Sequence, residues 1–149
     1  MKKIFFSLFT ICAIQITSAQ AWDGTGDQKV QAGINVWGNG GFGVKVSYDY
    51  GIAEAISIGS SLGVFSEGKT VDGQKKTAIS IVTRANYHLK DILDLPEHFD
   101  IYPGISLGLM GSAFDFGAHI GFRYFFTPSI GAFAEVGNRG GIGVVFNLD

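Results

Sequence analysis

Cysteine is nearly absent from this sequence of 149 residues, and long apolar runs are absent after its first segment. The single cysteine, Cys12, lies in that first segment, which is the part expected to be removed on export. The remaining chain can therefore form no disulfide, and it has no thiol nucleophile and no cysteine metal site. It also contains no apolar run of about 18 residues, so no transmembrane helix is expected in it.

Charged residues are also few, at 16% of the chain, whereas 46% of the residues are hydrophobic. Without Lys2 and Lys3, nine basic residues face 13 acidic ones, which gives a net charge of −4. This negative balance argues against a nucleic-acid partner. Because no membrane helix can hold the hydrophobic residues, they must be distributed along strands.

The first residues follow the order of a secretory signal peptide. Two lysines are followed by an apolar run from residue 4 to about residue 16, and then by the small-residue stretch Ala19-Gln20-Ala21. This order predicts a signal peptide over residues 1–21, cut after Ala21 or alternatively after Ala19. Residues 22–149 then form one exported domain.

Strict alternation of apolar and polar residues is the main pattern in that domain. In FGVKVSYDYG, residues 42–51, apolar side chains occupy every second position, as in a strand with two different faces. Alternation bounded by turn residues predicts eight strands, at 29–37, 42–50, 55–65, 77–89, 99–110, 114–125, 130–137 and 141–148. The connections between them are short, which favours an up-and-down antiparallel meander.

The two faces of these strands differ in charge. The face that carries Val44 has no charged residue in any of the eight strands, whereas the opposite face carries charges and many glycines. The interior of an eight-stranded barrel is only wide enough to be filled by side chains, so the numerous large apolar residues must point outward. An outer face without charge is what lipid requires. The predicted fold is an all-β, eight-stranded antiparallel up-and-down transmembrane β-barrel.

Four of the five tyrosines share the outward face and lie near one end of the predicted strands: Tyr48, Tyr50, Tyr87 and Tyr124. Tyrosine at one level is typical of the interfacial belt of a membrane barrel. With a periplasmic N-terminus, that end is periplasmic, with turns at 51–54, 90–98 and 126–129. The surface loops are then expected at 38–41, 66–76, 111–113 and 138–140.

Several tracts resemble the strands and turns of small outer-membrane barrels of the OmpA and OmpX type. The resemblance is carried by residues 48–59, 84–88, 101–108 and 133–137. It rests on strand patterning and implies a barrel domain of a Gram-negative outer membrane. The chain departs from the pattern in ending on Asp149, where such barrels usually end on an aromatic residue. No peptidoglycan-binding domain follows the barrel, so the resemblance does not imply anchoring to the cell wall.

Inward-facing charges form the candidate site. Counted from the periplasmic turns, Lys45, Arg84 and Glu135 are expected at similar heights, with Arg123 slightly lower. Opposite charges in a narrow interior must pair, because an unpaired buried charge is strongly destabilising. We therefore predict that these four residues form a structural cluster that plugs the lumen. Glu135 is expected to be the only acid at the height of Lys45 and Arg84. A gate over a narrow pore would use the same residues.

Three stretches match catalytic or nucleotide-binding motifs in sequence, but none is expected to have the secondary structure that its motif requires. The stretches at 59–63 and 104–108 fit G-x-S-x-G, but both lie within predicted strands instead of a strand–turn–helix elbow. The stretch at 38–43 fits G-x-G-x-x-G but precedes a strand, so it is interpreted as a hairpin turn. The three histidines, His88, His98 and His119, have no metal-ligand spacing. We therefore expect no enzymatic activity, cofactor or metal.

The sequence favours a non-enzymatic outer-membrane barrel that contributes to envelope integrity or surface contacts. Outer-membrane lipids are its expected partners, and a monomer is expected. Two further functional classes stay open as alternatives. A lipid-modifying enzyme would need His, Ser and an acid to converge at one membrane interface, and a soluble ligand-binding barrel would need an apolar lumen and a charged exterior.

Overall fold

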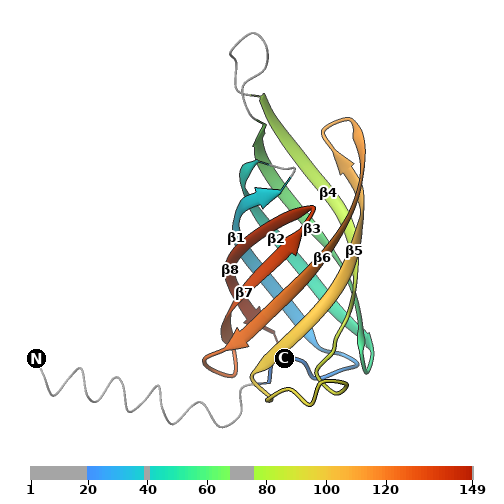
Figure 1. The fold of residues 1–149 in the computed structure, drawn as a ribbon, viewed down its shortest axis with the longest axis vertical. Coiled ribbons are helices and arrows are strands. Elements are labelled where there is room, and N and C mark those ends of the chain that lie inside the picture. Colours follow the sequence, from blue (N-terminus) through green and yellow to red (C-terminus); the bar gives the residue numbers. More distant parts are fainter. Residues whose placement is uncertain (1–19, 39–40, 68–75, 149) are drawn as a thin grey trace, which may run out of the picture.

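The computed structural model describes residues 20–38, 41–67 and 76–148. The chain forms one closed barrel in which each strand pairs antiparallel with its sequence neighbours and β8 closes on β1 (Figure 1). The strands are β1 Gln28–Gly38, β2 Phe42–Ala53, β3 Ile56–Glu67, β4 Lys76–Tyr87, β5 Phe99–Met110, β6 Ala113–Phe125, β7 Ile130–Gly137 and β8 Arg139–Asn147. The predicted eight-stranded up-and-down barrel is confirmed.

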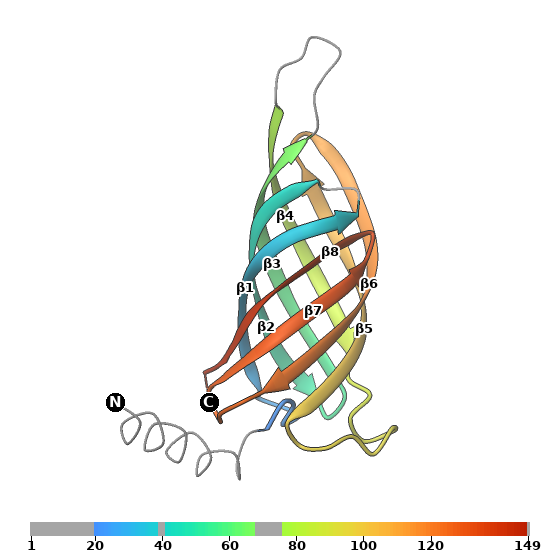
Figure 2. The same cartoon turned by 60° about the vertical axis from the view of Figure 1, so that its left-hand side comes forward.

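The two ends of the barrel differ in height around the circumference. We call the end with the β2–β3, β4–β5 and β6–β7 turns the base, and the opposite end the rim. Both views show β8 ending at the base and the β7–β8 hairpin reaching less far toward the rim than the β5–β6 hairpin (Figures 1 and 2). This difference follows from strand length, since β7 has 8 residues and β6 has 13.

Apolar side chains cover the outside of the barrel and polar ones fill the inside. Val44 on β2 is 56% exposed and Phe114 on β6 is 71% exposed, whereas Arg123 and Asp100 have no exposed surface. This distribution is the one that lipid requires. It is the reverse of what a soluble barrel with an apolar ligand cavity needs.

Strand boundaries differ from the prediction mainly at turns. β2 continues to Ala53 because a bulge between Gly51 and Ala53 shifts its register with β3. β4 ends at Tyr87 instead of residue 89, and β8 begins at Arg139 instead of residue 141, because only Asn138 separates it from β7. The alternation alone could not show these shifts, since turn residues can pair in a ladder when the hairpin is tight.

Two predicted surface loops contain residues 39–40 and 68–75, which lie outside the described residues, as do residues 1–19 of the predicted signal peptide. Of the other two predicted rim connections, the one near 111–113 is a tight turn between β5 and β6 in which Gly111 has a φ of 61°, and the one near 138–140 is reduced to Asn138 between β7 and β8. No helix in the described ranges is long and apolar enough to cross a bilayer.

Candidate functional site inside the barrel

Glu135 on β7 is the acceptor at the centre of the buried charges. Its carboxylate accepts hydrogen bonds from Lys45 Nζ, from Arg84 Nη2 at 2.6 Å and from the Tyr102 hydroxyl at 3.0 Å. The Glu135 side chain is 2% exposed and that of Lys45 is 12% exposed. The structure therefore brings Lys45, Arg84 and Glu135 together, in the cluster that the sequence indicated.

A second acid, Asp49 on β2, completes the cluster. Its carboxylate lies 3.1 Å from Arg84 Nε and 2.5 Å from Arg123 Nη2. The sequence prediction left Asp49 out of the cluster, but the strand register places Asp49 and Arg84 on either side of Gly59, which has no side chain to separate them. Glu135 is therefore not the only acid that pairs with Arg84. Arg123 pairs with Asp49, and more distantly with Asp100 at 3.7 Å. Arg84 pairs with both Asp49 and Glu135.

Tyr102 on β5 is a further member of the cluster that the sequence analysis did not single out. It is the one tyrosine of inward parity, it has no exposed surface, and the Arg123 guanidinium lies 4.1 Å from its ring centroid. Gln31 donates a hydrogen bond of 3.1 Å to the Tyr102 hydroxyl. The ring fits because Gly121 faces it, where an added Cβ would lie 2.1 Å from Tyr102 Cζ. Inward parity together with a facing glycine was the available signal.

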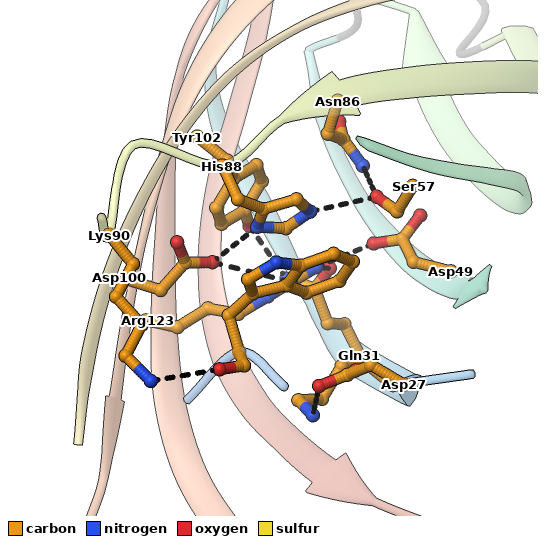
Figure 3. A network of polar contacts seen from close by, with 12 residues as sticks. Asp27, Gln31, Asp49, Ser57, Asn86, His88, Lys90, Asp100, Tyr102 and Arg123 are labelled. Carbon is orange, nitrogen blue, oxygen red and sulfur yellow. Dashed lines mark hydrogen bonds and ion pairs between the residues drawn. The ribbon is translucent and has the colours of Figure 1, made fainter. Parts of the chain in front are cut away.

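Nearer the base, His88 links two buried side chains (Figure 3). Its Nδ1 lies 2.8 Å from Asp100 Oδ2, and its Nε2 lies 2.9 Å from Ser57 Oγ. Asn86 Nδ2 donates to the same Ser57 oxygen at 3.0 Å. Burial lowers the pKa of His88 below its ordinary value, although hydrogen bonding to Asp100 opposes this shift. The neutral imidazole can then donate to Asp100 and accept from Ser57.

The order serine, histidine, acid is that of a hydrolytic triad, but its surroundings do not resemble a substrate site. The Trp22 indole stacks on the His88 ring with 3.4 Å between centroids and 4° between planes. Ser57 has no exposed surface. The indole of Trp22 therefore fills the space beside His88 that a substrate would need.

Another buried pair closes the base beside this stack. Asp27 Oδ2 lies 2.5 Å from Lys29 Nζ, and neither side chain is exposed. Burial raises the pKa of Asp27, and the Lys29 ammonium opposes that rise. Lys29 also donates to Asn147 Oδ1 on β8 at 3.0 Å. Buried charges therefore extend from the Asp27–Lys29 ion pair at the base to the cluster around Glu135.

The rim side of the cluster retains a small cavity of about 40 Å³. Lys45, Arg84 and Glu135 lie at its lower part, and Arg139, paired with Asp115, borders it toward the rim. A cavity of this size holds only a few water molecules.

The four tyrosines of the predicted interfacial belt lie on the outer face of the barrel. The four outward tyrosines are 37–43% exposed and lie toward the base: Tyr48, Tyr50, Tyr87 and Tyr124. Tyr50, Tyr87 and Tyr124 pair with Gln28, Ile56 and Phe99, the first residues of their strands.

The three histidines are separated. His119 Nε2 faces Asn86 Oδ1 at 3.0 Å inside the barrel, while His98 packs edge-on against Tyr124 at the base. In the described part of the chain, no three His, Cys, Asp or Glu side chains are grouped so that they could hold a metal ion. The serines of both G-x-S-x-G stretches, Ser61 and Ser106, lie within strands.

Comparison with known proteins adds a family and a fold. A family model described as "Family of unknown function (DUF6646)" matches residues 12–144. The chain belongs to the DUF6646 family. No curated protein matches this DUF6646 chain. A solved structure described as "De novo design of transmembrane beta-barrels" is similar, with a TM-score of 0.65 and 12% identity over 85% of this chain and 99% of the designed one. At that identity, the likeness shows that the DUF6646 chain shares the fold of a transmembrane barrel.

Proposed function

We propose that this chain is a non-enzymatic outer-membrane barrel of a Gram-negative bacterium, similar to the OmpA and OmpX type. It contributes to envelope integrity or to surface contacts, with lipids as its immediate partners and as a monomer. The observation that carries the proposal is the filled lumen, in which buried ion pairs extend from Asp27 and Lys29 at the base to Arg84 and Glu135. A wall that is apolar outside and ionic inside supports a role as a closed membrane scaffold.

Localisation can be tested first. After expression with the full N-terminal segment, the protein should be recovered in the detergent-extracted outer membrane. Recovery in the soluble periplasm would contradict the membrane assignment, and recovery in the cytoplasm would contradict export.

A narrow gated pore is the second candidate, favoured by the cavity that borders Lys45 and Glu135 on the rim side. The two candidates differ in conductance across planar bilayers. A closed scaffold should show no steady current, because the buried ion pairs of Glu135 and Asp49 occupy its lumen. Steady conductance of the wild-type barrel would make the pore the better assignment.

If the wild type shows no current and Glu135→Gln shows discrete channel openings, the cluster is a gate. A variant that is less stable and still silent would support the scaffold. Asp115→Asn serves as the control, since it changes the charge near the rim without touching the ion pairs that close the lumen.

A further inference from the structure

Residues Gln20–Asp27 fold into the base of the barrel, although the predicted cleavage after Ala21 would remove part of this segment. Ala21 has no exposed surface, and its backbone N–H donates to the carbonyl of Glu97 at 2.7 Å. It belongs to an apolar cluster with three inward-facing residues of the last three strands: Phe125, Phe133 and Val145. Ala21 is therefore part of the packed interior.

Trp22 is buried at the base. It is 3% exposed, and its indole stacks on the His88 ring. The indole Nε1–H donates to the carbonyl of Glu54 at 2.6 Å, and Lys90 Nζ donates to the Trp22 carbonyl at 3.0 Å. The β2–β3 turn and the β4–β5 connection thus both hold this residue in place.

The rest of the segment is tied to the first two strands. The backbone N–H of Asp23 donates to Asp27 Oδ2 at 2.8 Å, and the same carboxylate pairs with Lys29. Gly26 N donates to the carbonyl of Gly51, and Gly51 N donates to the carbonyl of Asp27, both at 2.8 Å. These bonds extend the β1–β2 ladder below Gln28, so the segment is continuous with the barrel wall.

The two possible cleavage positions have different consequences for this packing. Cleavage after Ala21 would remove the hydrogen bond to Glu97 and the contact with the apolar cluster. It would also leave a charged amine on Trp22, whose position is buried, and a buried charge without a partner is destabilising. Cleavage after Ala19 retains all of these contacts and places the new amine on Gln20, which is partly exposed.

We propose that signal peptidase cuts between Ala19 and Gln20, and that Gln20–Asp27 then folds back as a built-in stopper of the base. The step is a hydrolysis: water adds across the peptide bond, Ala19 leaves as the carboxyl end of the leader, and Gln20 gains the free amine. The inference rests on the proposed export of the chain. It gives the lumen a closure made by the new N-terminus in addition to the ion pairs of the strands.

Intact mass of the protein purified from membranes tests the cleavage position. The expected mass is that of Gln20–Asp149, or that mass less one ammonia if the N-terminal glutamine has cyclised. The mass of Trp22–Asp149 would overturn the inference while leaving export intact. An uncut chain would overturn both the inference and the proposed export, so the two failures are distinguishable.

Cysteine labelling tests the stopper, since no other cysteine follows Cys12. Ala21→Cys is the buried probe, and Thr25→Cys, at an exposed position in the same segment, is its matched control. In the folded barrel, a maleimide should modify Ala21→Cys at least about tenfold more slowly than Thr25→Cys, because reaction requires the segment to open. The two rates should converge in urea. Equal rates in the folded state would overturn the stopper.

A second measurement avoids any change in the segment, in case Ala21→Cys does not fold. The chain has two tryptophans, so Trp37→Phe leaves Trp22 as the only one. Acrylamide should quench its fluorescence several-fold less in the folded barrel than in urea, because the indole is 3% exposed. Quenching as efficient as in urea would show that the base is open.

Discussion

Removing the charge of Glu135 is the most direct test of the lumen network. In Glu135→Gln, the amide oxygen can still accept from Arg84 or from the Tyr102 hydroxyl, but the amide nitrogen is a donor and would face the Lys45 ammonium. Arg84 keeps Asp49 as its partner at 3.1 Å. Lys45 is therefore the cation that loses its acceptor.

The size of the effect follows from these partners. Removing one member of a buried ion pair destabilises by about 3–5 kcal/mol. We expect about 3 kcal/mol for Glu135→Gln, because Arg84 retains Asp49 and because the 12% exposed Lys45 borders the rim cavity. Asp115→Asn is the matched control, with the same change of acid to amide in a pair exposed by 14% and 22%. Its expected effect is at most about 1 kcal/mol.

The free energies of unfolding of Glu135→Gln and Asp115→Asn can be measured by urea unfolding of the barrel in liposomes. Tryptophan fluorescence and gel mobility follow the transition. A double variant that combines Glu135→Gln with Lys45→Met should recover part of the loss, with a coupling of about 1–2 kcal/mol, because the stranded cation is gone. The reasoning would be refuted if Glu135→Gln lay within about 0.5 kcal/mol of the wild type, or if the double variant lost the full sum of the two single effects.

Three further substitutions and one pH effect are measurable in the same unfolding assay. Val44→Arg should destabilise by about 2–4 kcal/mol if Val44 faces lipid near the midplane, whereas Val44→Leu should be close to neutral, and equal effects would mean that the faces are reversed. Tyr102→Phe should cost about 1–2 kcal/mol, since it removes the hydroxyl shared by two buried partners; no change would mean that this hydroxyl is not needed. Gly121→Val should cost more than Tyr102→Phe, because its Cβ would overlap the Tyr102 ring. Burial lowers the pKa of His88 below its ordinary value of 6.5, so as the pH falls the unfolded chain binds the proton before the folded barrel does. The free energy of unfolding should therefore decrease as the pH drops below 6.5. His88→Gln should make the free energy of unfolding less dependent on pH in this range.

The barrel itself could be predicted from the sequence, because strand alternation is a local property. Every second residue of β2 from Phe42 to Tyr50 is apolar, and an eight-stranded barrel has no room for such side chains inside. Parity therefore assigned Lys45, Arg84, Arg123 and Glu135 to the interior before any contact was known. Periodicity of two fixes the face of a residue whatever the rest of the chain does.

The partners of those residues were decided only in the tertiary structure. Parity gives the face but neither the reach of a side chain nor the relative height of strands that are far apart in the sequence. Arg84 and Asp49 come from β4 and β2, and their contact depends on the register that places both of them opposite Gly59 of β3. Likewise, the filling of the base by Ala21 and Trp22 depends on two connections, β2–β3 and β4–β5, and on three strands, β6, β7 and β8, that meet only when the barrel closes. Local alternation determines a strand and its faces, whereas ion pairing and packing inside a barrel depend on distances that exist only after the sheet has closed.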